Sequence, residues 1–133
     1  MTSAVEGLVG QSVGISLTVK DLEKSRHWYV DMLGFKEERR NEREGQLRTI
    51  GVGAGDVHLL LNLDDGAKGW TRVKGEGLSF SINTQQNIDD IAKRYRDAGG
   101  VFAMEPKDMP WGARVFRVVD PDGFKWSVSK RQG

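Results

Sequence analysis

The sequence has no cysteine among its 133 residues, which excludes disulfide bonds, thiolate metal ligands and a cysteine nucleophile. It has two histidines in total, His27 and His58. Neither sign of charge dominates, since 20 Lys and Arg balance 19 Asp and Glu, and nothing in this balance favours nucleic acid or an anionic membrane as partner. No segment approaches the roughly 20 apolar residues that a membrane span needs. The balanced charge fits a small neutral or zwitterionic partner better. The start of the chain lacks the basic and apolar regions of a secretion signal, so we expect a cytoplasmic protein.

A pattern of six residues occurs twice in the chain. Residues 14–19 read Gly-Ile-Ser-Leu-Thr-Val, and residues 77–82 read Gly-Leu-Ser-Phe-Ser-Ile. This alternation predicts two strands, each with one buried face. The residues expected to face a core are Ile15, Leu17, Val19, Leu78, Phe80 and Ile82. The small and polar residues between them face the other way, and function should be sought on that face.

The same series of elements follows each copy of the pattern. A helix with Asp21 or Asn87 as its N-cap ends at a glycine, and three strands come after it. The expected strands after the helices are 35–44, 46–52, 57–63, 101–105, 114–119 and 124–129. We therefore predict an α+β fold of two tandem βαβββ modules, which form curved mixed sheets with helices on the outer face. A single domain, 1–133, would hold module one at about 12–63, a linker at 64–76 and module two at about 77–130.

Three segments have simple structural interpretations. The charged run from Phe35 to Glu44 predicts a solvated edge strand. The spaced glycines at 51–55 lie within a hairpin and open no helix, so they are not a dinucleotide fingerprint. Residues 120–123, Asp-Pro-Asp-Gly, predict a turn with no further role. Trp28 and Trp126 are expected to belong to the core.

The face opposite the predicted core holds the candidate binding residues. His58 and Leu60 share this face of the fourth strand. Trp111 lies in a glycine-flanked loop, where it is expected to form a lid over a flat ligand. Arg114 is a candidate for contacting a ligand's oxygen atoms, and Lys125 has the same strand parity as Ser127. The candidate ligand-binding residues are Ser16, Thr18, His58, Leu60, Ser79, Ser81, Trp111, Arg114 and Ser127.

Several motifs occur in an order that is specific to one family. They are Leu-Thr-Val-Lys-Asp-Leu-Glu-Lys-Ser at 17–25, Trp-Tyr at 28–29 with Leu-Gly-Phe at 33–35, and Pro-Trp-Gly-Ala-Arg-Val-Phe at 110–116 before Asp-Pro-Asp-Gly at 120–123. With these motifs the sequence resembles the vicinal oxygen chelate superfamily, which includes glyoxalase I, the extradiol dioxygenases and the bleomycin- and fosfomycin-resistance proteins. The last segment most resembles the metal-free bleomycin-resistance branch. That resemblance implies a homodimer whose paired sheets enclose two pockets.

The metalloenzymes of this superfamily imply a divalent ion held by His or Glu at four positions. By resemblance these positions fall at Gly14, Leu60, Gly77 and Ser127, none of which is a His or Glu. A catalytic divalent ion needs about three or more protein donors. We therefore expect no metal and no other cofactor.

Two functions remain open on the sequence. The first is a non-catalytic protein that sequesters an antibiotic or an aromatic metabolite. The alternative is a metal-independent isomerase or lyase that uses His58 as its base. His58 is also the one histidine that could act as the base for a serine on the face opposite the predicted core. Pairing of the modules within one chain and pairing across a dimer are both compatible with the repeat.

Overall fold

The structure, a computed structural model, describes residues 7–132 and contains two four-stranded sheets. The first module consists of β1 (Ile15–Val19), α1 (Leu22–Arg26), η1 (His27–Met32), β2 (Lys36–Arg43), β3 (Gln46–Ala54) and β4 (Val57–Leu63). The second module consists of β5 (Phe80–Asn83), α2 (Ile88–Asp97), β6 (Phe102–Asp108), β7 (Ala113–Val119) and β8 (Lys125–Arg131). The strand orders are β1-β4-β3-β2 in the first sheet and β5-β8-β7-β6 in the second. Each sheet is mixed, because its first pair is parallel and its other pairs are antiparallel, so the predicted α+β fold class is confirmed.

The helices begin and end where the sequence predicts. The side chain of Asp21 accepts a hydrogen bond from the backbone N–H of Lys24, and that of Asn87 accepts one from Asp90. Gly34 follows the first helix with φ at +98°, a conformation that glycine adopts without strain. The first helix is not uniform, however, because α1 continues directly as the π-helix η1. None of the helices in the described part of the chain has the length and apolar character to cross a membrane.

The second copy of the six-residue pattern forms a shorter strand than predicted. β5 begins at Phe80, because Gly75 and Gly77 both have positive φ and turn the chain before it can pair. The N–H of Leu78 donates to the carbonyl of Gly75 at 3.2 Å inside this turn. Leu78 was expected in the core, but it is 57% exposed. Strand pairing thus begins three residues later than the alternation indicates.

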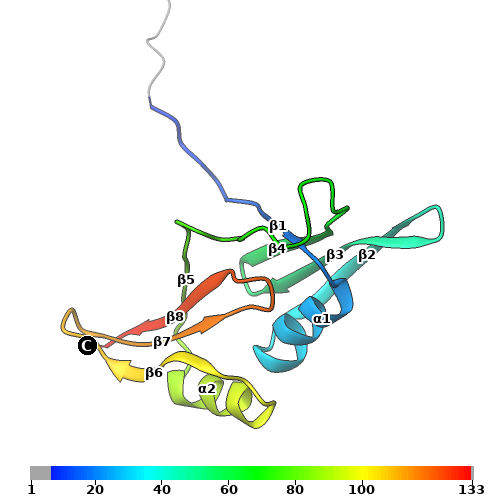
Figure 1. The fold of residues 1–133 in the computed structure, drawn as a ribbon. Coiled ribbons are helices and arrows are strands. Elements are labelled where there is room, and N and C mark those ends of the chain that lie inside the picture. The colour runs from blue at the N-terminus through cyan, green and yellow to red at the C-terminus, as the bar shows by residue number, and fades with distance from the viewer. Residues whose placement is uncertain (1–6, 133) are drawn as a thin grey trace, which may run out of the picture.

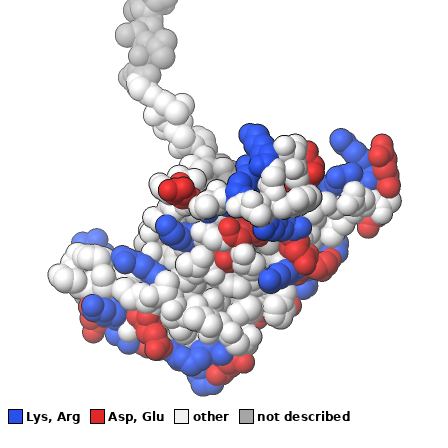
Figure 2. All heavy atoms as spheres, in the orientation of Figure 1, with Lys and Arg blue, Asp and Glu red and all other residues white. Residues whose placement is uncertain are grey.

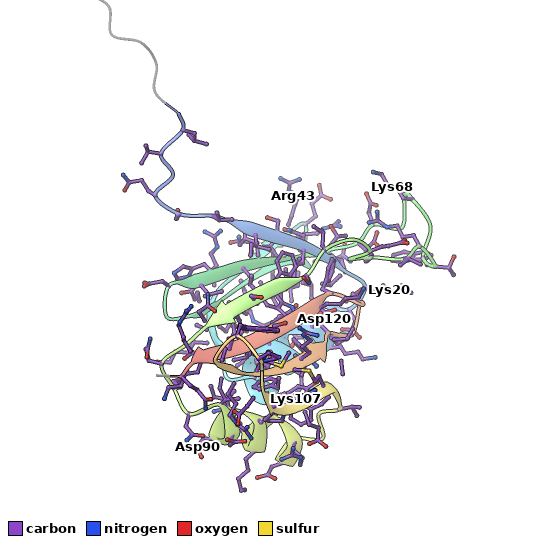
Figure 3. All side chains as sticks on the ribbon, turned by 90° about the vertical axis from the view of Figure 1, so that its left-hand side faces the viewer. Lys20, Arg43, Lys68, Asp90, Lys107 and Asp120 are labelled. Carbon is purple, nitrogen blue, oxygen red and sulfur yellow. The ribbon has the colours of Figure 1, made fainter. Side chains whose placement is uncertain are left out.

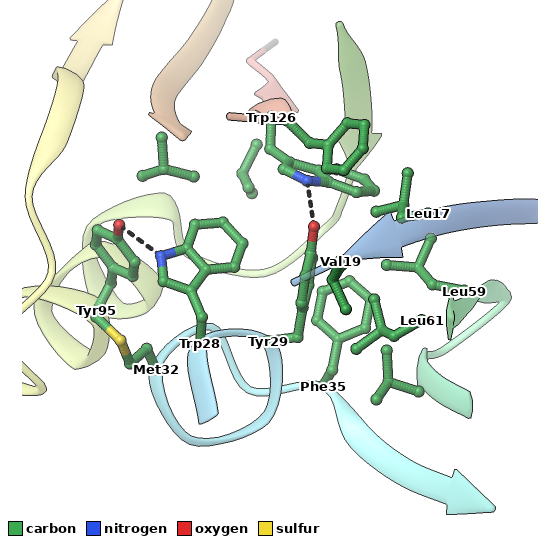
Figure 4. Close-up of a cluster of buried hydrophobic side chains, with 14 of the residues drawn as sticks. Leu17, Val19, Trp28, Tyr29, Met32, Phe35, Leu59, Leu61, Tyr95 and Trp126 are labelled. Atoms are coloured by element: carbon green, nitrogen blue, oxygen red, sulfur yellow. Dashed lines mark hydrogen bonds between the residues drawn. The ribbon is translucent and has the colours of Figure 1, made fainter. Parts of the chain in front are cut away.

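One hydrophobic core joins the two modules (Figure 4). Trp28 and Trp126 are both buried in it, as predicted. The indole N–H of Trp28 donates to the hydroxyl of Tyr95 at 3.2 Å, and that of Trp126 donates to the hydroxyl of Tyr29 at 2.9 Å. Each bond connects residues of different modules, so the two modules fold around shared aromatic side chains.

The turn at 120–123 does more than reverse the chain, which corrects the sequence interpretation. Asp120 is buried near the middle of the molecule (Figure 3), and its Oδ2 accepts a hydrogen bond of 2.6 Å from the Tyr29 hydroxyl. Its Oδ1 accepts from the backbone N–H groups of Asp122 and Phe124. Burial raises the pKa of Asp120, while the hydrogen bond from Tyr29 opposes that change. This carboxyl group therefore connects module two to the first helix.

The linker is held against both modules by a buried lysine. The Lys74 ammonium lies 2.8 Å from Oδ2 of Asp64 and 3.6 Å from Oδ1 of Asp122. Lys74 lowers the pKa of Asp64 to about 2, and the backbone N–H of Gly66 acts in the same direction. Between these anchored ends the linker loops out around Lys68 (Figure 3).

The shared core determines where the other faces of the sheets lie. Figure 1 shows both helices on the same side of the two sheets, and the core residues of both sheets lie on that helix side. The opposite faces, which we call the open faces, point away from the core and do not face each other within one chain.

Candidate functional site

The open face of the first sheet carries four of the predicted binding residues. Parallel pairing places Ser16 beside Leu60 and Thr18 beside Asn62. Antiparallel pairing places His58 opposite Gly53 and Leu60 opposite Gly51. Neighbours in such pairs share a face of the sheet. Ser16, Thr18, His58 and Leu60 therefore lie together, as the alternation predicts.

A hollow of about 530 Å³ lies over this open face. It is lined by residues of the first module: Gly14, Ile15, Ser16, Glu38, Arg39, Gly51, His58, Leu59 and Leu60. Its floor is the sheet itself, and the second module of the same chain contributes no lining residue. The hollow is therefore open to one side rather than an enclosed cavity.

Two glycines on β3 make room for the charged side chains of β2. A Cβ at Gly53 would lie 2.6 Å from the carboxylate of Glu38, and one at Gly51 would lie 3.0 Å from Cγ of Arg39. The register of β2 shifts between Glu37 and Arg39, which is a β-bulge. Strict alternation would put two successive residues on opposite faces, but the bulge lets both Glu38 and Arg39 lie over the open face.

His58 and Glu38 form a hydrogen-bonded pair within the hollow. Nδ1 of His58 lies 2.9 Å from Oε1 of Glu38. Both side chains remain about half exposed, so a ligand in the hollow could reach the imidazole. A carboxylate that holds one ring nitrogen fixes the orientation of the ring and presents the other nitrogen. The arrangement can donate or accept a hydrogen bond, and it can transfer a proton.

The sequence interpretation missed Glu38 and Arg39, because it assigned them to a solvated charged edge. β2 is indeed the edge strand of the sheet and is exposed along its length. The available signal was the pair of glycines at 51 and 53, which share one face of β3. Two glycines on one strand face leave space that long side chains of the neighbouring strand can occupy.

The open face of the second sheet carries two more of the predicted residues. Ser81 pairs with Ser127, and Ser127 pairs with Arg117 on its other side. Lys125 lies two residues before Ser127 on β8 and so shares this face, as its parity predicts. Ser79 is exposed just before β5 begins. This face holds polar and basic side chains beside Val115 and Val119, whereas the face behind it holds Trp126.

Two predicted residues lie elsewhere. The guanidinium of Arg114 is on the helix side, where Nε and Nη2 donate to the carboxylate of Asp89 on α2 at 2.9 Å each. A third hydrogen bond, from Nη1, goes to Asp108 at 3.0 Å. β7 pairs Arg114 with Lys130 rather than with a serine of the open face. Arg114 therefore does not lie on the open face, which corrects the sequence prediction. Trp111 lies in the turn before β7, is 59% exposed and does not line the hollow.

A second hollow of about 820 Å³ lies at the junction of the modules on the helix side. Its apolar wall includes Leu33, Ala54, Ile82 and Val128. At its rim, Arg94 donates to the backbone carbonyls of Val30 and Asp31 at 3.4 and 3.5 Å. It contains none of the predicted binding residues.

The donor atoms of the open faces do not fit a divalent metal. Ser16 and Leu60 pair on the first sheet, and Ser81 and Ser127 pair on the second, which gives neutral hydroxyls and an apolar side chain. Within residues 7–132, no group of three or more His, Cys, Asp or Glu side chains could hold a metal ion. The His58–Glu38 pair supplies two donors at most, fewer than a catalytic ion needs. Metal independence remains a prediction, which rests on this donor chemistry.

The chain is similar to known proteins by family profile, by sequence and by structure. The profile of the Glyoxalase/Bleomycin resistance protein/Dioxygenase superfamily matches residues 12–128. A probable lactoylglutathione lyase of Synechocystis sp. is 30% identical over 116 residues, which cover 82% of this chain and 86% of that protein. The crystal structure of TioX from Micromonospora sp. ML1 has a similar fold, with a TM-score of 0.73 at 21% identity over 92% of this chain and 99% of that one. The hypothetical protein SA1046 from S. aureus has a TM-score of 0.70 at 25% identity, over 93% of this chain and 95% of that one.

Proposed function

We propose that this chain, which belongs to the Glyoxalase/Bleomycin resistance protein/Dioxygenase superfamily, binds a small, partly aromatic molecule without the help of a metal. The observation that supports this best is the hollow over the first sheet. Leu60 and Gly51 contribute apolar surface to its floor, and Arg39, His58 and Ser16 place polar groups around that floor. Few polar groups around an apolar surface are typical of small-molecule sites.

We also propose that a second copy of the chain completes this site. The open faces lie outside the shared core, and the hollow has walls from one module only. In a homodimer, the open face of the first sheet would be covered by the open face of the partner's second sheet. Light scattering at micromolar concentration should therefore give twice the mass of one chain. A monomer that still binds its ligand would contradict this arrangement.

The alternative function is a metal-independent isomerase or lyase that uses His58 as its base. The 2.9 Å contact between His58 and Glu38 favours it, because a carboxylate that orients an imidazole is a common partner of a general base. A binding protein and an enzyme are both compatible with this contact. Removal of the imidazole would change mainly the affinity of a binding protein, but the turnover of an enzyme.

Replacing His58 with alanine should distinguish the two functions. If His58 only lines a binding site, the affinity for the ligand should fall by less than about tenfold, or about 1.4 kcal/mol. If it is a general base, turnover should fall by about 10² to 10⁴-fold. The ligand would first be found by tryptophan-quenching titrations against a panel of aromatic metabolites.

His27 provides the control, because it is an exposed histidine on η1 that contacts Asp31. His27→Ala should leave both affinity and turnover unchanged. Absence of binding to every aromatic compound in the panel would contradict the proposed function. About one tightly held transition metal per purified chain, lost in His58→Ala, would contradict metal independence.

A further inference from the structure

Several basic side chains on the helix side of the molecule are paired with carboxylates. Arg26 and Arg40 both contact Glu37, at 2.7 and 2.9 Å. Arg114 contacts Asp89, and Arg96 of α2 contacts Glu105. Figure 2 shows basic and acidic atoms side by side in several clusters on the face that is in view. These four arginines therefore have carboxylate partners within the chain.

The basic side chains of the open faces differ. Arg39 lies over the first sheet, and Arg117, Lys125 and Arg131 lie over the second. Among residues 7–132, none of these four lies within salt-bridge distance of an Asp or Glu. The carboxylate that lines the hollow, Glu38, already contacts His58. The open face of the second sheet therefore carries three basic groups that form no salt bridge with a described acidic side chain, whereas Arg39 on the first sheet shares its hollow with the Glu38 carboxylate.

The basic groups of the second sheet lie close together and beside hydroxyl groups. Arg117 is directly opposite Ser127, and Lys125 is two residues from Ser127 along β8, or roughly 7 Å. Ser81 adds a further hydroxyl on the parallel neighbour strand. Two like charges at this distance repel each other, and the attraction of both to a bound anion offsets that repulsion. Guanidinium, ammonium and hydroxyl groups are the donors that carboxylates and phosphates accept from.

We propose that the ligand of this site is an anion with an apolar body, and that Arg117 and Lys125 bind its carboxylate or phosphate group. The inference rests on the proposed function, since it identifies the ligand class of the same site. In the dimer, Arg39 of the second copy approaches the same ligand from the first sheet. The apolar body lies against Leu60, and the anionic group lies over the second sheet.

Two fluorescent probes with the same ring system test this proposal. Anilinonaphthalene sulfonate is an anion, and N-phenylnaphthylamine is its uncharged counterpart. The wild-type protein should bind the sulfonate about tenfold or more tightly than the amine. Arg117→Gln and Lys125→Gln should each weaken binding of the sulfonate about fivefold and leave binding of the amine unchanged.

Lys130 gives a matched control, because it is on the same strand as Lys125 but pairs with Arg114 on the helix side. Lys130→Gln should not change the affinity for either probe. Citrate and pyrophosphate are then added as competitors at matched ionic strength. Displacement of the sulfonate by citrate indicates a carboxylate ligand, and displacement by pyrophosphate indicates a phosphate ligand. Displacement by neither would contradict the proposal.

The failures of the two proposals are distinguishable. If both probes bind equally, and the Arg117 and Lys125 variants behave like Lys130→Gln, the site binds small molecules but does not select anions. If neither probe binds, the proposed function itself is wrong. A loss of sulfonate binding in Lys130→Gln as large as in Lys125→Gln would show nonspecific attraction and would also overturn the anion site.

Discussion

Replacing Asp120 with alanine should lower the free energy of unfolding by about 3 kcal/mol. The variant leaves the buried hydroxyl of Tyr29 without its acceptor at 2.6 Å. It also removes the acceptor of the backbone N–H groups of Asp122 and Phe124. Each buried donor that loses its partner costs about 1–3 kcal/mol, and the contact connects the modules, so the loss affects the whole fold. Urea denaturation, followed by tryptophan fluorescence, measures this change.

Asp65 is the control for this experiment. Its carboxylate accepts a hydrogen bond from the backbone N–H of Ala67, two residues later, as that of Asp120 does from Asp122. Asp65, however, is exposed in the linker. Asp65→Ala should change the free energy of unfolding by less than about 1 kcal/mol, because water can replace the lost acceptor. Equal destabilisation by the two variants would show that the contact between Asp120 and Tyr29 is not important for stability.

Replacing Gly51 with leucine should reduce binding of a small molecule by at least about 100-fold. Gly51 lies in the floor of the hollow, where a Cβ would be 3.0 Å from Cγ of Arg39 and 3.6 Å from Cδ2 of Leu60. The contact at 3.0 Å requires Arg39 to shift by a few tenths of an ångström, which the exposed edge strand β2 allows, so the fold should persist. The remaining leucine atoms then occupy the space of the ligand, and a clash of this kind costs several kcal/mol. Titration with anilinonaphthalene sulfonate measures the loss, and circular dichroism checks the fold.

Ala54→Leu is the matched control, because Ala54 is on the same strand but faces the second hollow, on the helix side. This variant should leave the affinity unchanged. The opposite result, in which Ala54→Leu abolishes binding and Gly51→Leu does not, would move the binding site to the module junction. The two variants therefore test which of the two hollows binds the small molecule.

Much of the first sheet's open face was predictable from the sequence. Ser16, His58 and Leu60 line the hollow because a strand alternates its faces every second residue, and that period is visible in the residues themselves. The N-caps Asp21 and Asn87 were predictable for a similar reason, since a cap acts on backbone groups two or three residues away.

The charged part of the site was not predictable in the same way. Glu38 and Arg39 reach the hollow through a β-bulge, and a bulge depends on how β2 pairs with β3. The sequence interpretation places Arg114 on the wrong face, because the register that pairs β7 with β8, and Arg114 with Lys130, cannot be read from the residues of either strand alone. Its partner Asp89 belongs to α2, which packs against this sheet. These outcomes depend on contacts between separate elements.

The sequence by itself determined the elements, their order and the alternation of each strand, because these follow from interactions between residues a few positions apart. The tertiary structure decided which faces remain open. Tyr29 and Asp120 lie 91 positions apart in the chain, and their contact, with that between Trp126 and Tyr29, joins the two modules through one core. Burial of aromatic surface by both modules at once favours this arrangement. It leaves the hydroxyl and basic side chains of both sheets on outer faces, where a ligand and a second copy can reach them.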